Sequence, residues 1–525
     1  MTTTQTDPSG LTEATELTEP TERTEQTEQT ELGLLPGERW WGGLAADGPA
    51  MPFGVEPHSR DLAVEAGTNQ SAPVLLSSAG RYVWSARPFA FAFSGDRLAL
   101  EGRGVVVRHP GHTLRDAYQA AARAHFPATG AAPARALFTG PQYNSWIQMP
   151  YRPSQDAVVA YVRELLDDGL PPGVVMVDDM WSEDYGVWEF AEARFPDPAA
   201  MVAELHALGC SVMLWVVPWI SPDSAAFREL EPLGLLLRGA DGQTVVRRWW
   251  NGLSALLDLS RPEAVDWMRT RLRSLQQRYG IDGFKMDGGD LQDYRIDDQA
   301  RGYEPVDMVK AWSALGEEFA FNEMRASWAT GGRALAQRVQ DKPPTWEAVR
   351  SLVPTMVAQG LLGMPFTCPD MVGGGEVGSM GEVEVVDQEL FVRYAQVAAL
   401  SPMMQFSLSP ARALDDAHLP AVRAAVNLRQ SLLPDLMGLV DVAAATGEPV
   451  VRHMAYHAPG LEDVTDQYFL GPDLLVAPVV EPGATVRSVV LPDGDWRGAS
   501  GETISGPATV EVPVGIDSIP VFRRV

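Results

Sequence analysis

Short apolar runs alternate with helix-like stretches through the middle of the chain, from residue 133 to 430. Residues 174–177 are a continuous β-branched and apolar run, which is typical of a buried strand, whereas 198–208 carry apolar residues at helical spacing. Residues 211–217 predict the next strand. Because strands and helices follow one another in this order, the pattern predicts an α/β fold built from parallel strands.

The same alternation continues into a long helix expected over 262–279, with Pro262 in its first turn. That helix leads into a short strand over 283–287, which ends at Asp287 and is followed by two glycines. Repetition of this unit over almost 300 residues predicts a (β/α)8 TIM barrel, in which residues at the carboxyl ends of the strands face the active site. A doubly wound open sheet is the alternative, but no Gly-x-Gly-x-x-Gly segment follows an early strand.

The two flanks of the barrel carry a different pattern, in which short alternating runs are separated by turn residues. Over 33–132 this predicts an N-terminal β-sandwich, followed by a helix over 114–125, and over 431–525 it predicts a C-terminal all-β domain. The strands expected in the first flank lie at 80–84, 88–93, 97–101 and 104–107, and those in the second at 450–453, 474–478, 486–491 and 509–513.

Residues 1–32 repeat Thr and Glu and contain eight acidic residues against Arg23 alone. Such a tract buries too little apolar surface to offset the entropy of ordering it, so a disordered acidic tail is expected there. A partner-binding role for this tail is a second hypothesis.

Composition limits the partners that this chain can bind. With 45% apolar and 21% charged residues, it resembles a globular enzyme, and a net charge of −28 disfavours nucleic acid and anionic membrane surfaces. Only Cys210 and Cys368 are present, and the eight histidines are scattered, so no disulfide framework, metal or cofactor is expected. We expect a cytoplasmic protein, since the N-terminus lacks the pattern of a signal peptide and no apolar run is long enough to span a membrane. A homo-oligomer is compatible with a barrel of this size, although no residue decides the question.

Polar and aromatic residues gather at the predicted strand tips. The barrel opening is expected to contain several carboxylates, one lysine, one arginine and many tryptophan rings. This mixture suits a sugar, because its hydroxyls need polar partners and its C–H faces pack on aromatic rings. The candidate residues are Tyr143, Asn144, Trp146, Asp178, Asp179, Trp181, Trp215, Trp219, Lys285, Asp287, Arg325, Trp328, Asp341, Trp346, Asp370, Gln405 and Ser407. Taken singly, each Trp is as well explained by packing in the core, so the prediction depends on the set.

Asp287 and Asp341 fit the two roles that cleavage of a glycosidic bond requires. One carboxylate attacks or stabilises the anomeric carbon, and the other protonates the leaving oxygen. We expect the cation of Lys285 to keep Asp287 ionised, and we expect burial against Trp346 together with nearby negative charge to keep a proton on Asp341. An ion pair of Lys285 with Asp178 or Asp179 is compatible with this effect on Asp287. Asp290 and Asp293 are expected to cap the segment that follows the glycines.

Four segments together resemble glycoside hydrolase family 31, most closely its myogenesis-regulating glycosidase branch, whose characterised vertebrate member is an α-galactosidase. They are residues 282–289 (DGFKMDGG), 340–346 (QDKPPTW), 365–374 and 399–407, within a match that covers about 135–430. The resemblance implies a TIM barrel between an N-terminal β-sandwich and a C-terminal β-domain. It also implies a retaining, exo-acting α-glycosidase that takes a small oligosaccharide or glycoside as its substrate.

By this resemblance, Asp287 is expected to be the nucleophile and Asp341 the general acid/base. Arg325, sixteen residues before Asp341, matches an arginine that binds sugar hydroxyls, and either Asp178 or Asp179 matches an acidic group that holds the far end of the ring. The remaining expected sugar contacts are Trp181, Trp215, Trp219, Lys285, Trp328, Asp370 and Gln405. An alternative for Asp370 is that it holds the glycine loop that follows it.

One departure from the family bears on specificity. Family α-glucosidases end the last barrel strand with a histidine, whereas residues 405–407 of this chain are Gln-Phe-Ser. This difference favours α-galactosides over plain glucosidase activity. The alternatives are an α-glucosidase or α-xylosidase, a transglycosylase or lyase on the same scaffold, and a sugar-binding protein without catalysis, which would not need both Asp287 and Asp341.

Overall fold

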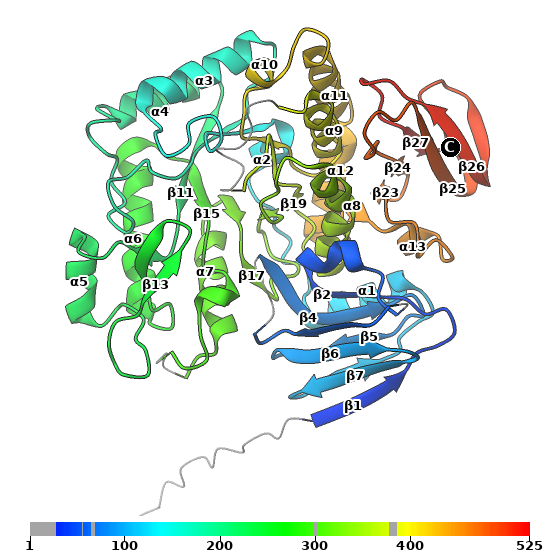
Figure 1. Ribbon diagram of the computed structural model, residues 1–525, viewed down its shortest axis with the longest axis horizontal. Coiled ribbons are helices and arrows are strands. Elements are labelled where there is room, and N and C mark those ends of the chain that lie inside the picture. Colours follow the sequence, from blue (N-terminus) through cyan, green and yellow to red (C-terminus); the bar gives the residue numbers. More distant parts are fainter. Residues whose placement is uncertain (1–27, 55, 65–68, 299–301, 377–385) are drawn as a thin grey trace, which may run out of the picture.

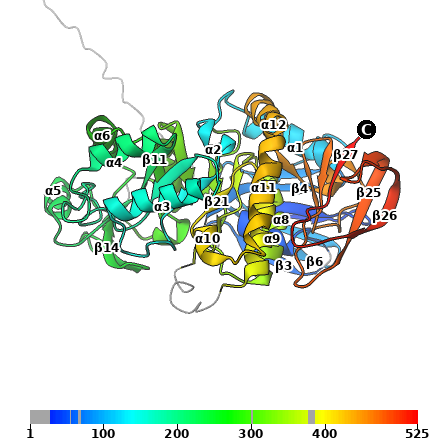
Figure 2. The same ribbon diagram turned by 90° about the horizontal axis from the view of Figure 1, so that it is seen from above.

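The computed structural model describes residues 28–54, 56–64, 69–298, 302–376 and 386–525. A central barrel lies beside two N-terminal sheets, and a C-terminal sheet stands at the far end of the molecule (Figure 1). Seen from above, the barrel and the β-rich parts lie side by side, with α11 (Leu419–Ser431) between them (Figure 2). Within the described part of the chain, no helix is long and apolar enough to cross a membrane.

The barrel is one parallel sheet that closes on itself. Its order is β19-β18-β16-β15-β11-β10-β9-β21-β20, and each strand pairs in parallel with its neighbour. The first and last members, β19 (Thr367–Cys368) and β20 (Met371–Val372), are two segments of one stretch, interrupted at Asp370, whose φ is +69°. Counting that stretch once gives eight positions around a closed ring, so the predicted TIM barrel is confirmed.

The other barrel strands are short, and three of them, at 174–177, 211–216 and 283–286, lie in the apolar runs that predicted strands. They are β9 (Gln142–Asn144), β10 (Val174–Val177), β11 (Ser211–Val216), β15 (Gly283–Met286), β16 (Phe321–Met324), β18 (Gln337–Arg338) and β21 (Gln405–Phe406).

Helices cover the outside of most of the ring. They are α3 (Gln155–Asp167), α4 (Pro198–Ala207), α6 (Pro262–Tyr279), α7 (Pro305–Glu317), α8 (Trp346–Leu361) and α9 (Gln388–Ala399). In α6, Pro262 opens the helix, Gly280 ends it with φ +77°, and Met268 and Leu272 are among the residues it buries at helical spacing. The smaller helical segments are η1 (Ala45–Ala50), α1 (Leu114–His125), α2 (Ala136–Thr139), η2 (Leu291–Asp293) and α10 (Pro410–Ala413).

Two connections depart from the simple β–α repeat. After β11 the chain makes an excursion through β12 (Trp219–Ile220), α5 (Ala225–Leu233), β13 (Val246–Trp249) and β14 (Gly252–Leu256) before α6 begins. Between β16 and β18, residues 325–336 form no helix; instead β17 (Ser327–Trp328) pairs with the N-terminal strand β4 (Gln70–Ser77). The N-terminal region is thereby joined to the barrel by backbone hydrogen bonds.

The N-terminal region consists of two antiparallel sheets apart from that parallel β4–β17 pair. One contains β1 (Glu28–Gly33), β7 (Arg97–Gly102), β6 (Phe89–Ser94) and β3 (His58–Asp61), and the other contains β2 (Trp40–Leu44), β4, β5 (Tyr82–Trp84) and β8 (Val106–Arg108). The helix predicted over 114–125 is confirmed as α1.

The predicted tail needs a correction at its end. Glu28–Gly33 is a strand that pairs with Arg97–Gly102 along its whole length, so the prediction of disorder is wrong for 28–32. An edge strand is stabilised by backbone pairing and needs little apolar burial. The polar composition of this segment therefore led to a wrong prediction of disorder. Residues 1–27 of the predicted tail lie outside the described residues.

The predicted start of the C-terminal β-domain at 431 is also too early, because Leu433–Thr446 forms helix α12. After it come β22 (Val451–Arg452), α13 (Met454–His457), β23 (Tyr468–Leu470), β24 (Leu474–Val476), β25 (Val486–Arg497), β26 (Thr503–Pro513) and β27 (Val521–Arg524). These strands make a six-stranded sheet whose small core includes Phe469, Trp496 and Phe522.

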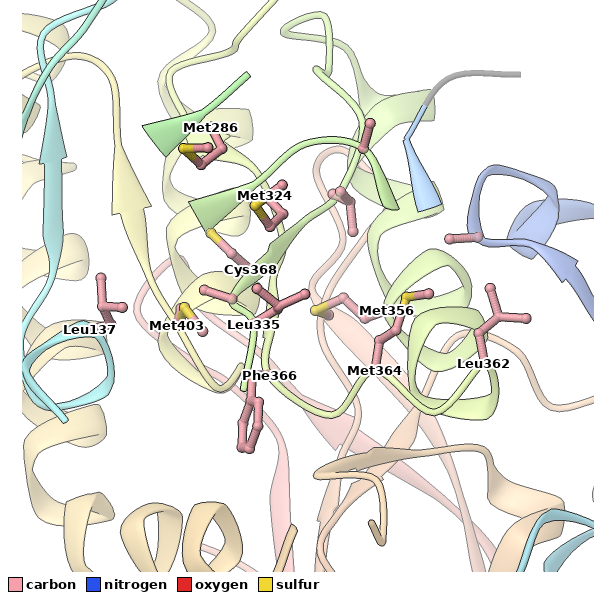
Figure 3. Close-up of a cluster of buried hydrophobic side chains, with 14 of the residues drawn as sticks. Leu137, Met286, Met324, Leu335, Met356, Leu362, Met364, Phe366, Cys368 and Met403 are labelled. Carbon is pink, nitrogen blue, oxygen red and sulfur yellow. The ribbon is translucent and has the colours of Figure 1, made fainter. Parts of the chain in front are cut away.

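The large core continues from the barrel wall into the helices. Along β15, Lys285 faces the inside of the barrel, whereas Met286 points outwards and packs with Met324, as Figure 3 shows. This alternation places apolar side chains outside the wall and polar ones inside it, where the site lies.

Candidate active site

A cavity of about 280 Å³ opens at the carboxyl ends of the barrel strands. It is lined by Trp146, Asp178, Asp179, Trp215, Trp250, Lys285, Asp287, Arg325, Gln340, Asp341, Met371, Gly375 and Glu376. Eight of these thirteen residues are among the candidates named from the sequence. The volume suits a single sugar ring better than an extended chain.

Asp287 lies directly after β15, where its backbone N–H donates to the carbonyl of Val216. Gly288 and Gly289 follow with φ of +59° and +68°, and a Cβ on Gly289 would come within 2.9 Å of Trp312. Both positions therefore require glycine, which explains the Asp-Gly-Gly sequence at this strand tip. The turn directs the Asp287 carboxylate into the cavity, where Oδ2 accepts a hydrogen bond of 2.7 Å from the indole N–H of Trp215.

Three cations surround the Asp287 carboxylate. The Nζ of Lys285 lies 3.9 Å away, the Nε of Arg325 3.6 Å and the Nη2 of Arg338 3.8 Å. Burial raises the pKa of Asp287, but the three positive charges outweigh burial and hold this pKa below its usual range. Asp287 is therefore an ionised carboxylate at neutral pH, as a nucleophile must be.

Asp341 enters the same cavity from the loop after β18. Its Oδ2 lies 2.7 Å from Nη1 of Arg325, and its Oδ1 lies 2.5 Å from Nη1 of Arg338. Burial raises the pKa of Asp341, yet Arg338 and Arg325 lower it further than burial raises it. Both carboxylates thus touch the same two guanidinium groups, which brings Asp287 and Asp341 together across one cavity.

The expected environment of Asp341 needs a correction. Trp346 begins α8 and donates its indole N–H to Asp387, so it does not line the cavity. The groups nearest to Asp341 are the guanidinium groups of Arg325 and Arg338, whereas an indole ring and negative charge were expected there. In this structure the carboxyl is held ionised, and a proton would reach it only once the arginines are engaged elsewhere.

The structure separates the neighbouring acids Asp178 and Asp179. Lys285 pairs with Asp178 at 2.6 Å, as expected for an ion-pair partner in the barrel mouth, and it also lies 3.9 Å from Asp287. Asp179 instead accepts hydrogen bonds from Tyr185 at 3.1 Å and from Asn251 at 2.5 Å. Burial and the charge of Asp178 raise the pKa of Asp179 to about 7. Both acids line the cavity.

Five predicted sugar contacts do not line the cavity, and for these the prediction is corrected. Trp181 lies behind the wall and donates to the carbonyl of Trp215, and Trp219 stacks on Trp249 at a centroid distance of 5.1 Å. Trp328 is on β17 beside the N-terminal sheet. The other two are Asp370 and Gln405, each fully buried.

Asp370 and Gln405 instead hold other groups in place. Asp370 accepts from Nη1 of Arg338 at 2.7 Å and from the backbone N–H of Lys342 at 2.8 Å. The amide of Gln405 donates to Glu323 inside the barrel, so it does not reach a ligand in the cavity. Trp181 and Asp370 follow barrel strands, whereas Trp219, Trp328 and Gln405 lie within short strands. A side chain in either position can point sideways or down the barrel as well as into its mouth.

Several cavity residues were missed from the sequence. Trp250 lies in the turn of the β13–β14 hairpin, and its ring covers the guanidinium of Arg325 at 5.1 Å. The Trp-Trp-Asn-Gly run at 249–252 contains a hairpin-turn signal that could have located it. Arg338 contacts both carboxylates although it is not a lining residue, and it had no comparable signal, because β18 is only two residues long. The other missed lining residues are Gln340, Met371, Gly375 and Glu376.

The N-terminal region stabilises the site through hydrogen bonds to Asp290, Arg325 and Arg338. The backbone N–H of Asn69 donates to Asp290 at 2.7 Å, and Asp290 in turn binds Nε of Arg325 at 2.9 Å. Gln70 donates to the backbone carbonyls of Arg325 and Arg338. Asp290 also caps the η2 turn together with Asp293, as expected. Among the described residues, no cluster of three or more His, Cys, Asp or Glu is arranged to hold a metal ion.

Known proteins share this organisation. The model of the glycosyl hydrolases family 31 TIM-barrel domain matches residues 136–439, and that of the family's C-terminal domain matches 447–525. The chain is 32% identical over 420 residues to the myogenesis-regulating glycosidase of Mus musculus, and 28% identical over 434 residues to the 1,3-alpha-isomaltosidase of Kribbella flavida. These alignments cover 76% and 71% of this chain, and the chain spans 58% of the length of each relative.

A solved structure has the same fold over nearly the whole chain. The GH31 dextranase of Flavobacterium johnsoniae, complexed with glucose, superposes with a TM-score of 0.85 at 20% identity, covering 95% of this chain and 66% of that one. The barrel match spans more than half of the sequence and the match to the mouse relative exceeds 30% identity. The chain therefore belongs to glycoside hydrolase family 31.

Proposed function

We propose that this chain is a retaining, exo-acting α-glycosidase that removes terminal α-galactosyl residues from a small oligosaccharide or glycoside. The observation that carries the proposal is the meeting of Asp287 and Asp341 in one sugar-sized cavity, where both carboxylates touch Arg325 and Arg338. Two carboxylates in such a cavity are the minimum requirement for glycoside hydrolysis by double displacement.

In the first step, Asp287 attacks the anomeric carbon while Asp341 donates a proton to the departing oxygen. Lys285 and the Trp215 N–H favour the ionised form of Asp287, which supports its role as the nucleophile. In the second step, Asp341 takes a proton from a water molecule, and that water hydrolyses the glycosyl-enzyme ester. The aspartate then leaves as a carboxylate, so the anomeric configuration is retained.

Binding of the sugar also explains how Asp341 gains its proton. Arg325 donates to Asp341 at 2.7 Å. A sugar hydroxyl that accepts from Arg325 would draw this guanidinium away from Asp341, and loss of a nearby positive charge raises the pKa of a carboxyl group. Arg325 therefore has two roles in the proposal, substrate binding and control of the acid.

The far end of the sugar faces β10. In the closed ring, β10 and β18 lie on opposite sides, so Asp179 stands across the cavity from Asp341. The leaving group lies beside Asp341, and we therefore assign Asp178 and Asp179 to the hydroxyls farthest from it. Asp179, backed by Tyr185 and Asn251, closes this end of the cavity, which supports removal of single terminal sugars.

The galactoside preference rests on the resemblance to the myogenesis-regulating glycosidase branch. Gln405 does not support this preference, because its side chain is buried away from the cavity. An α-glucosidase is the second candidate, because the relative from Kribbella flavida is named an isomaltosidase and the Flavobacterium johnsoniae structure holds glucose. An α-xylosidase and a transglycosylase are further alternatives.

A panel of 4-nitrophenyl α-glycosides separates these candidates. We expect turnover of the α-galactoside, and activity confined to the α-glucoside or α-xyloside would overturn the preference while leaving the mechanism intact. Asp287→Asn should abolish turnover, and azide should restore the formation of a β-galactosyl azide. Normal rates in Asp287→Asn would remove this residue from the mechanism.

The acid/base role of Asp341 has a separate test. Asp341→Asn should slow the hydrolysis of glycosides with poor leaving groups more than that of nitrophenyl glycosides, since nitrophenolate hardly needs a proton. Equal losses on both substrates would assign the acid to another residue.

A further inference from the structure

Arg338 is a buried cation at the centre of four carboxylates from different parts of the barrel. Its side chain is 1% exposed. The partners are Glu323 at 3.2 Å from Nε, Asp341 at 2.5 Å from Nη1, Asp370 at 2.7 Å from Nη1 and Asp287 at 3.8 Å from Nη2. Neither the sequence patterns nor the family resemblance assigned a role to this arginine.

One nitrogen of Arg338 serves two acids. Nη1 donates to Asp341 and to Asp370, so the two carboxylates share the same end of the guanidinium. Asp370 is fixed from its other side, because its Oδ2 accepts from the backbone N–H of Lys342, the residue after Asp341. A Cβ on Gly375 would lie 3.1 Å from both Oδ1 of Asp341 and Oδ2 of Asp370, which shows how closely the loop packs over this pair.

We propose that Arg338 and Asp370 are positioning residues for Asp341: the guanidinium aims the Asp341 carboxylate into the cavity, and Asp370 competes with Asp341 for the positive charge. The inference deepens the proposed function, since it rests on Asp341 being the acid/base. Arg338 acts through Asp341 and is not itself among the residues that line the cavity.

The competition predicts which group carries a proton. Burial raises the pKa of Asp370, and although Arg338 lowers it, the charge of Asp341 helps to raise it to about 7. In Asp341, the two arginines outweigh burial and the pKa is lowered. Of the two acids, Asp370 therefore keeps a proton to the higher pH, and the two titrate as one system.

Other charges also face this pair. Lys285 and Asp287 lie on the β15 side, Glu323 and Arg325 on the β16 side, Lys342 in the acid/base loop, and Cys368 and Tyr394 behind Asp370. Asp370→Asn leaves all of these groups and Arg338 in place, whereas Arg338→Met also removes the positive charge beside Glu323 and Asp287.

The test measures the basic limb of the pH profile of kcat/KM on the nitrophenyl glycoside that the wild type hydrolyses fastest, because this limb reports the acid of the free enzyme. Arg338→Met removes the cation, so the limb should move up by about one pH unit. Asp370→Asn removes the competing carboxyl group from Nη1, so Arg338 serves Asp341 alone and the limb should move down by about one pH unit. Shifts of opposite sign from two touching residues are not expected from a general loss of packing.

Glu323→Gln is the matched control. Glu323 is a buried carboxylate on the Nε side of Arg338, away from Asp341, so its substitution should shift the limb by less than half as much as Asp370→Asn. An equal shift from Glu323→Gln, or shifts of the same sign from Arg338→Met and Asp370→Asn, would overturn the inference. If Arg338→Met does not fold, the comparison of Asp370→Asn with Glu323→Gln still decides it.

A direct titration separates this inference from the proposed function. In protein labelled with ¹³C at the aspartate carboxyls, the Asp341 signal is identified by its loss in Asp341→Asn. Its midpoint should fall in Asp370→Asn and rise in Arg338→Met, whether or not the enzyme turns over any glycoside. An inactive wild type that shows these shifts would refute the proposed function alone, and an active wild type without them would refute the inference alone.

Discussion

The hydrogen bond from Trp215 to Asp287 gives the most direct test of how this cavity prepares a nucleophile. Trp215→Phe removes the N–H that donates to Asp287 Oδ2 at 2.7 Å and keeps most of the buried ring. The three neighbouring cations remain, so Asp287 loses one donor and no charge. The ionised form of the carboxylate is thereby destabilised relative to the protonated form.

The size of the effect follows from the type of bond. A hydrogen bond to a charged group contributes about 1.5–3 kcal/mol, and one pKa unit corresponds to about 1.4 kcal/mol. The pKa of Asp287 should therefore rise by about one to two units. Because this pKa begins below its usual range, Asp287 stays ionised at pH 7, and the loss of activity appears mainly at acidic pH.

The assay is the acidic limb of kcat/KM, which should move up by about one to two pH units in Trp215→Phe. Trp181→Phe is the matched control, since the Trp181 indole donates at 2.7 Å to the backbone carbonyl of Trp215 and not to the carboxylate. This control should lower the stability and leave the limb in place. An unmoved limb in Trp215→Phe, or an equal movement in Trp181→Phe, would refute the reasoning.

Three further predictions concern the surroundings of the cavity. Gln70→Leu removes the hydrogen bonds that its amide donates to the carbonyls of Arg325 and Arg338, each worth about 0.5–1.5 kcal/mol, so its thermal unfolding midpoint should fall clearly below that of the exposed control Gln29→Leu; equal midpoints would contradict the supporting role of the N-terminal sheet. Burial and the charge of Asp290 raise the pKa of Asp293 to about 8, so stability linked to this group is lost as the pH rises from about 4 to 8. Asp293→Asn should therefore gain stability over the wild type across that range in denaturant unfolding, and a constant difference would argue against the shift. Trp250→Ala uncovers Arg325, and we expect a higher KM with little change in the unfolding midpoint; an unchanged KM would exclude the ring from substrate binding.

Much of the fold could be predicted because its signals are local. The strand over Val174–Val177 and the helices over Pro262–Tyr279 and Leu114–His125 occupy the expected residues, since apolar periodicity, Pro at a helix start and Gly at a helix end act within a few residues. Predictions failed where stability comes from distant pairing. The acidic strand Glu28–Gly33 has no apolar pattern of its own and forms only because β7 offers it a free edge.

For the site, the sequence by itself determined that Asp287 follows a barrel strand, because two glycines end the apolar run there, whereas the segment around Asp341 was identified by the family resemblance. It could not determine which strand-tip side chains share the cavity. That depends on the register of neighbouring strands and on the direction of each side chain. The side chain of Gln405 points into the barrel interior, whereas that of Arg325 lines the cavity.

Only the tertiary structure decided the electrostatics of the site. Arg338 stands on a two-residue strand and meets acids up to 51 positions away along the chain, and no local pattern could have paired them. Its charge reverses the expected state of Asp341, from a carboxyl that keeps its proton to one held ionised. The reason is physical: a pKa depends on the distances between charges in a buried space, and those distances exist only once the barrel has closed.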